Sequence, residues 1–242
     1  MSHGRLGKYS LWQFRDFAID RGVAILIVGF LWGYVLVAPF RAPGQQLQLN
    51  PFSPVWPLLI TVASSIVSVA VLIAVNGIVS LDRKLGYYRF LFSKPVSVLA
   101  FYAQLYFVHM AGVVATMLVL SLVLRTIVPD FSIVNYLLYT GLMFVAMGGI
   151  GFFISVATRF DWVTLAAVWL GSRALRDLYG AKPGLPGKLV QLLPPVHKLN
   201  GVADDLITRG SAPTSDVIWL LAYGALFFGL GLVLLRQTSL AD

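Results

Sequence analysis

Long apolar stretches alternate with short polar ones along the whole chain. Five runs contain no Asp, Glu, Lys or Arg, and each is long enough to cross a hydrocarbon core of roughly 30 Å as a helix. These runs are residues 23–40, 55–79, 96–124, 131–158 and 217–235. The pattern predicts an all-α, multi-pass membrane protein, with residues 1–242 forming a single transmembrane domain.

A sixth helix is predicted over residues 162–178. Only eleven residues, 162–172, precede Arg173 without a charge, and they would span about 16 Å at a rise of about 1.5 Å per residue. A full crossing must continue past Arg173, Arg176 and Asp177, and each unpaired charge near the bilayer centre costs about 2.5–3.5 kcal/mol. Arg173 and Asp177 stand four apart and can pair on one helical face.

Composition agrees with residence in lipid. The chain is 58% hydrophobic and 12% charged, whereas soluble domains carry about 25% charged residues. The net charge of +8 comes from basic residues in short segments between apolar runs, which indicates contact with membrane lipids and no nucleic-acid partner. The run 23–40 is longer than a signal-peptide core of about 7–15 residues, so we expect an uncleaved first span.

The basic residues also predict orientation. Four precede the first span, and Arg83, Lys84, Arg89 and Lys94 lie between the second and third spans, which favours a cytoplasmic N-terminus. Six more occur between residues 173 and 209, and charge counting would keep that stretch cytoplasmic, with five crossings in all. Glycines and prolines break it into short helical pieces that we expect to re-enter the membrane edge.

Two amphipathic segments flank the first spans. Within an interfacial lead-in over residues 1–22, one side of the helix carries Gln13, Asp16 and Asp20, and the other carries Leu11, Phe14, Phe17 and Ala18. In the second segment, Leu81, Leu85, Tyr88 and Phe92 form one apolar face opposite Asp82, Arg83 and Arg89. This second pattern is typical of a lipid anchor or of a helix that docks a soluble partner.

The second segment also carries a family resemblance. Residues 86–97, GYYRFLFSKPVS, resemble the cytoplasmic segment of the ABC-2 type permeases, the membrane subunits of one class of ATP-binding-cassette transporter. That family has a Gly, an acidic residue three positions later, leucines and then Ser-x-Pro-Val-Ser before the third span. Here Arg89 occupies the acidic position. The order of lead-in, spans and broken segment resembles the family over nearly the whole chain.

The resemblance implies a permease that works with a second permease copy, identical or related, and with a nucleotide-binding ATPase that holds ATP and Mg. It implies six crossings, with short outer helices before the last span, and export of an amphipathic or hydrophobic substrate across the plasma (inner) membrane. The residues implied in ATPase coupling are Asp82, Arg83, Lys84, Gly86, Tyr87, Tyr88, Arg89 and Lys94. The chain lacks a phosphate loop, since Gly187-Lys188-Leu189 has neither the earlier Gly nor the hydroxyl residue; we therefore expect the ATPase to be another chain.

Polar residues inside the spans are the candidates for a translocation path. Thr61, Ser64, Ser65, Ser68 and Asn76 recur at helical spacing in the second span, and His109 lies in the third. Such a stripe indicates either helix packing or a substrate path.

Catalytic chemistry has little visible machinery. No metal-binding motif occurs, cysteine is absent, and the three histidines are far apart, so we expect neither a cofactor bound by this chain nor enzymatic activity. Two other functions remain open. A membrane enzyme acting on lipids would use Arg173, Arg176, Asp177 and His197, and a structural subunit of a larger membrane complex would need none of them.

Overall fold

The computed structural model describes residues 3–37, 56–86, 97–128, 130–158, 161–181, 184–191, 193 and 196–237. These parts of the chain are almost entirely helical and contain no strand. Five helical stretches in them are long and apolar enough to cross a membrane: Tyr9–Tyr34, Trp56–Leu85, Val98–Thr126, Ile133–Ala157 and Thr214–Gln237. All five overlap the predicted runs, which confirms for the described residues an all-α fold with five helices suited by length and composition to cross a membrane.

The first span begins earlier than predicted. Helix α1 (His3–Phe17) continues through the π-helical segment η1 (Ala18–Gly22) into α2 (Val23–Val37) without an intervening loop. The whole stretch runs beside α6 (Val98–Ile127) in the same direction, with Gln13 bonded to Gln104 and Gly29 packed against Leu120. The lead-in is therefore continuous with the first span, and its position at a membrane interface stays a prediction.

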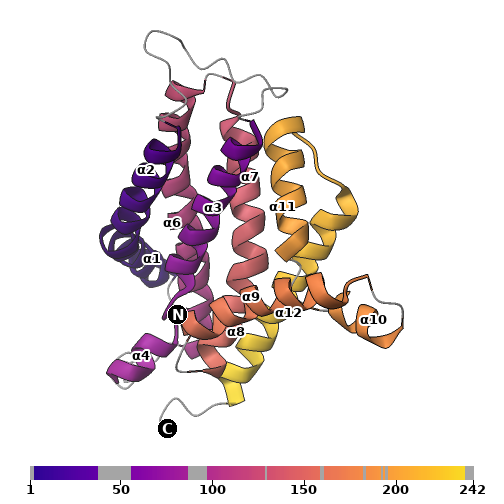
Figure 1. Ribbon diagram of the computed structural model, residues 1–242. Coiled ribbons are helices and arrows are strands. Elements are labelled where there is room, and N and C mark those ends of the chain that lie inside the picture. The colour runs from indigo at the N-terminus through magenta and orange to yellow at the C-terminus, as the bar shows by residue number, and fades with distance from the viewer. Residues whose placement is uncertain are drawn as a thin grey trace.

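The second span is interrupted near its end. Helix α3 (Trp56–Val75) stops four residues before the apolar run does, and a turn over residues 76–79 leads into the short helix α4 (Ser80–Leu85). Gly77 lies in the left-handed region with φ of 74°, a conformation that side chains with a Cβ rarely adopt. The turn redirects the chain at one end of the bundle, where Figure 1 shows α4 standing apart from the long helices.

The fourth and last spans pack closely on each other. The fourth consists of α7 (Ile133–Met143), the π-helical segment η3 (Phe144–Gly148) and α8 (Gly149–Ala157), and the last is α12 (Thr214–Gln237). A Cβ added to Gly149 would collide with the carbonyl group of Gly224, and one added to Gly231 would collide with the ring of Phe152. These glycines let the two backbones touch, as small residues do between membrane helices. The pairing of 149 with 224 and 152 with 231 shows that α8 and α12 run in the same direction.

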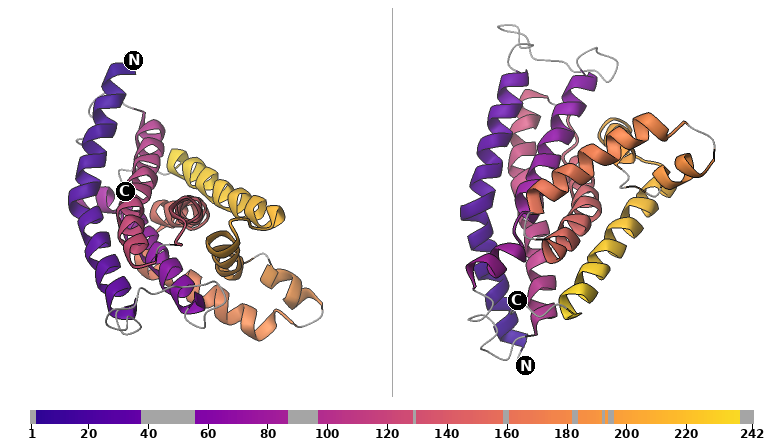
Figure 2. Two further views of the ribbon diagram at one scale, coloured as in Figure 1. Left: turned by 90° about the horizontal axis from the view of Figure 1, so that it is seen from above. Right: turned by 60° about the horizontal axis from the view of Figure 1, so that its bottom comes forward.

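Between α8 and α12 the described residues form α9 (Asp161–Tyr179), α10 (Leu185–Gln191), α11 (Val196–Asp204) and η4 (Asp205–Arg209). The helix predicted over residues 162–178 forms as α9, but α9 runs across the bundle toward α10 (Figures 1 and 2) and is not among the five apolar stretches. Its charges, including Arg176 and Asp177, lower its hydropathy. The chain reaches the end of the bundle opposite α4 through α11 and η4, where Thr208 bonds to Trp56 at the start of α3.

Candidate functional site

The candidate site is α4 with the groups that hold it, because α4 is the described part of the predicted ATPase-coupling segment. Asp82, Arg83 and Lys84 lie on α4, and Gly86 follows it. The other four predicted coupling residues lie outside the described residues: Tyr87, Tyr88, Arg89 and Lys94.

Asp82 and Arg83, two of the three consecutive charged residues of α4, are turned toward the bundle. The Tyr102 hydroxyl of α6 donates to Oδ2 of Asp82 at 3.2 Å, and Nη1 of Arg83 donates to the Val156 carbonyl of α8 at 3.2 Å. On the other side of α4, Leu81 and Leu85 are 46% and 55% exposed. The charged side thus anchors the helix, while its apolar side faces outward.

The helix of this segment is shorter than its apolar periodicity predicts. The pattern from Leu81 to Phe92 suggested one continuous helix, but α4 ends at Leu85 because Gly86 adopts a left-handed conformation with φ of 70°. The Gly86 N–H bonds back to the Arg83 carbonyl at 3.4 Å, the usual way in which glycine ends a helix. The prediction of one helix through residue 86 was therefore wrong.

The break between α3 and α4 is capped by side chains from two other helices. Arg21, in η1, donates to the carbonyl groups of Ile73, at 3.4 Å, and Ala74 in the last turn of α3. On the α4 side, Oγ of Ser155 in α8 accepts the backbone N–H groups of Val79 at 3.0 Å and of the next residue, Ser80, at 3.2 Å. Helix ends leave such groups without intrahelical partners, and a cation also interacts favourably with a helix C-terminus. The break is therefore a defined structure.

A buried polar cluster lies beside this break. The Gln104 amide donates to Oε1 of Gln13 at 3.1 Å, and Gln13 is buried at 3% exposure. His109 is also buried, with its ring 5.1 Å from the ring of Phe17 between centroids. Its Nδ1 has no hydrogen-bond partner among the described residues, and Arg21 lies close enough to interact with it electrostatically.

The same contacts correct the predicted faces of the lead-in. Gln13 was assigned to the polar side and Phe17 to the apolar side, yet both are buried against α6. Leu11, from the predicted apolar side, is 73% exposed. The amide pair between Gln13 and Gln104 lets a polar residue occupy the packed face.

The predicted translocation residues do not form one surface. Thr61, Ser65 and Ser68 lie on the less covered side of α3, and Asn76 is exposed in the turn that follows it, whereas Ser64 and His109 are buried. The hydroxyl groups of Thr61, Ser64 and Ser68 donate to carbonyl groups one turn earlier in α3, at 2.8, 3.1 and 2.8 Å. Because their polar groups are satisfied within the helix, these residues can border either lipid or a substrate path.

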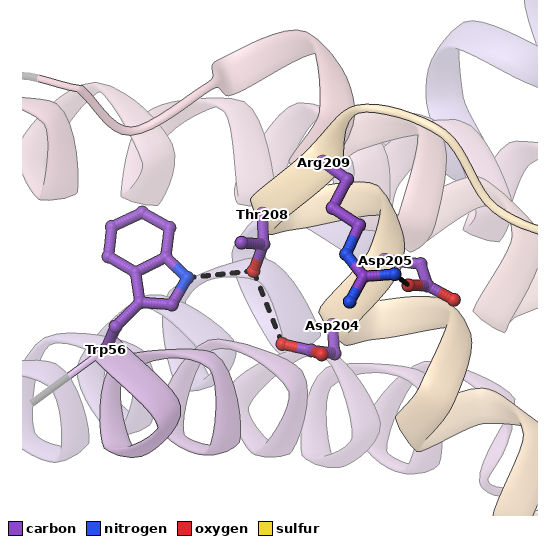
Figure 3. A network of polar contacts seen from close by, with 5 residues as sticks. All are labelled: Trp56, Asp204, Asp205, Thr208 and Arg209. Carbon is purple, nitrogen blue, oxygen red and sulfur yellow. Dashed lines mark hydrogen bonds and ion pairs between the residues drawn. The ribbon is translucent and has the colours of Figure 1, made fainter. Parts of the chain in front are cut away.

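A second polar network lies at the opposite end of the bundle (Figure 3). Nε1 of Trp56 donates to Oγ1 of Thr208 at 2.8 Å, and Thr208 donates to Oδ1 of Asp204 at 3.3 Å. Next to them, Arg209 pairs with Asp205 at 3.1 Å. The network fastens η4 to the start of α3.

The residues proposed for a lipid enzyme have mainly structural contacts where they are described. Nη2 of Arg176 donates to the Val190 carbonyl at 3.3 Å and so joins α9 to α10, while Asp177 is exposed. The side chains of Arg173 and His197 lie outside the described part of the chain. Within that part, no group of three or more His, Asp or Glu side chains is placed to hold a metal ion.

Two residues of the site were not predicted. Arg21 entered the sequence analysis only as one of the four basic residues before the first span, and Ser155 as part of the apolar run 131–158. The dipeptide Asn76-Gly77 is a turn signal inside the run 55–79, and it indicates a break that needs caps. Nothing in the sequence identifies which residues supply them.

No protein-family model, curated protein sequence or solved structure matches the chain. Support for a function therefore comes from the residues and their arrangement.

Proposed function

We propose that this chain is the permease subunit of an ATP-driven ABC-2 type exporter in the plasma membrane, coupled to a separate ATPase chain that binds ATP and Mg. The observation that carries the proposal is that α4 is bonded to the bundle on one side and exposed on the other. Its charged pair, Asp82 and Arg83, is bonded to α6 and α8, while Leu81, Lys84 and Leu85 face outward. A helix fixed on one side and open on the other is suited to receive a push from a soluble partner and pass it to the spans.

The role of this chain would be mechanical, because it would convert movement of the ATPase into movement of the spans. When the ATPase closes on ATP, it would hold the coupling segment, residues 81–97, in one of two positions. Each position would favour a different packing of the spans, so the spans would rearrange with the segment. The free energy would come from nucleotide binding on the partner.

We propose six crossings with both termini in the cytoplasm. The fifth would be composite, formed by α9 to η4 in place of a single apolar helix. Support comes from the two ends of this stretch: Ser155, shortly before it, contacts the α4 end of the bundle, whereas Thr208 contacts Trp56 at the other end. The basic residues before the first span and around α4 favour a cytoplasmic position for that end.

A second copy of the permease would complete the translocation path. Only 22% of the apolar stretch of α12 is buried inside the protein, against 72% of that of the fourth span, Ile133–Ala157. Helix α12 therefore offers a wide surface to lipid or to another subunit. The open polar side of α3, with Thr61, Ser65 and Ser68, and the exposed Asn76 just after it would line the path. The buried Ser64 and His109 would support it from behind.

The test is purification of the tagged chain from its native membranes. We expect a chain with a phosphate-loop motif to co-purify and to hydrolyse ATP in a Mg-dependent manner. The double reversal Lys84→Glu with Arg89→Glu should abolish co-purification, and Lys188→Glu on the exposed side of α10 is the matched control that should retain it. Absence of any phosphate-loop chain, or equal hydrolysis with the double reversal, would refute the proposal.

A further inference from the structure

Ser155 serves as the N-terminal cap of α4, although it lies on another span. The residue in the N-cap position is Val79, which has no side-chain acceptor and makes no side-chain cap bond. Oγ of Ser155, 76 residues further along the chain, accepts the Val79 N–H at 3.0 Å and the Ser80 N–H at 3.2 Å. All three residues are buried, with exposures of 0 to 2%. In such surroundings an N–H group without an acceptor is costly, so this hydroxyl fixes where α4 begins.

The cap bonds α4 to α8 across the break that separates α4 from α3. Helix α3 ends at Val75, Gly77 then turns the chain at φ of 74°, and the carbonyl groups of Ile73 and Ala74 in the last turn of α3 accept from Arg21 of η1. A second bond between α4 and α8 joins Arg83 to the Val156 carbonyl. Short polar contacts therefore connect α4 directly to α8.

From α8 the packing continues directly to α12. Gly149 and Gly224 bring the two backbones into contact, and Gly231, seven residues further along α12, lies against the ring of Phe152. At Gly149 and Gly224 backbone faces backbone, so no flexible side chain lies between the two helices there to absorb a shift of α8 along its axis. Contiguous contacts of this kind can carry mechanical coupling when the elements have two arrangements.

We infer that Ser155 is a positioning residue that transmits movement of the coupling segment to α8 and α12. This role rests on the proposed coupling of residues 81–97 to an ATPase. It adds to that proposal that the movement passes through the fourth and last spans. Continuity of the chain alone would suggest that the movement passes through α3.

The first part of the test examines the cap in the full-length protein without a partner. Amide hydrogen exchange of the peptide containing Val79 and Ser80 should accelerate about tenfold in Ser155→Ala, because removing the acceptor for two buried donors favours local opening. Ser155→Thr keeps the hydroxyl oxygen and should restore the slow rate. Ser121→Ala is the control, since Ser121 is equally buried but bonds within its own helix.

The second part examines transmission in the complex with the ATPase. A cysteine replacing Ser215, exposed at the start of α12, gives a single labelling position in this cysteine-free chain. Trapping nucleotide on the ATPase should change its maleimide labelling rate severalfold in the parent and in Ser155→Thr. In Ser155→Ala the change should disappear while the ATPase still co-purifies. If Ser155→Ala folds poorly, Arg83→Gln removes the other bond to α8 at a half-buried position and should reduce the change.

The outcomes separate the two proposals. Unchanged exchange at Val79 and Ser80 in Ser155→Ala would overturn the capping role, and a full nucleotide response in that variant would overturn the route through α8. A parent complex that binds ATPase but shows no response at residue 215 would also overturn this route. Failure of the parent to bind any ATPase would refute the permease proposal instead, and the exchange result would still decide the capping role.

Discussion

The indole N–H of Trp56 donates to the Thr208 hydroxyl at 2.8 Å, and the bond joins the first residue of α3 to a segment 152 positions away in the chain. It fixes the end of η4 at the side of the bundle opposite α4. The two halves of the connection between α8 and α12 run in different directions: α9 runs across the bundle, whereas α11 and η4 run along it (Figure 2). A crossing assembled in this way needs no single apolar run of about 20 residues.

Cysteine labelling tests this topology. With Ser211→Cys, just after η4, and Leu85→Cys, at the end of α4, each position is exposed and the chain supplies no other thiol. In intact cells a membrane-impermeant maleimide should label residue 211 and leave residue 85 unlabelled until the membrane is opened. Labelling of both residues, or of neither, from outside would contradict opposite locations for the two ends.

The bond between Trp56 and Thr208 should contribute measurably to stability. Trp56→Phe and Thr208→Val each remove one partner, and a buried neutral hydrogen bond contributes about 0.5–1.5 kcal/mol. The two losses should be less than additive in a double-mutant cycle measured by unfolding in detergent. Trp219→Phe removes an indole at a position that is 39% exposed and should change stability little. Strict additivity would show that the bond contributes nothing.

The contact between the fourth span and α12 predicts a sharp difference between two glycines of α12. Gly224→Ala would press a methyl group into the Val145 carbonyl, and overpacking of this kind costs about 1–3 kcal/mol. We expect a lower Tm and a lower yield of monodisperse protein. At Gly229 an added Cβ meets nothing within 4 Å, so Gly229→Ala should keep or raise the Tm. Similar Tm values for both variants would show that the helices do not touch at Gly224.

The sequence was a good guide to the long helices and a poor guide to the polar contacts between them. An apolar run encodes a span by its length alone, so α6 and α12 could be placed to within three residues. The break after α3 had a local signal in Asn76-Gly77, but its caps, Arg21 and Ser155, depend on contacts with residues more than 50 positions away. The direction of α9 could not be predicted because its charges allowed both an interfacial and a crossing helix.

Site-specific photocrosslinking from α4 tests the central claim most directly. A photoreactive residue at Leu85, 55% exposed on α4, is compared in native membranes with one at Val134, 67% exposed at the other end of the bundle. The proposal predicts that position 85 crosslinks to a chain that carries a phosphate loop, that added nucleotide changes the yield, and that position 134 gives no such product. If position 85 captures no nucleotide-binding chain under conditions in which the protein is folded and membrane-inserted, the coupling role of α4 is contradicted.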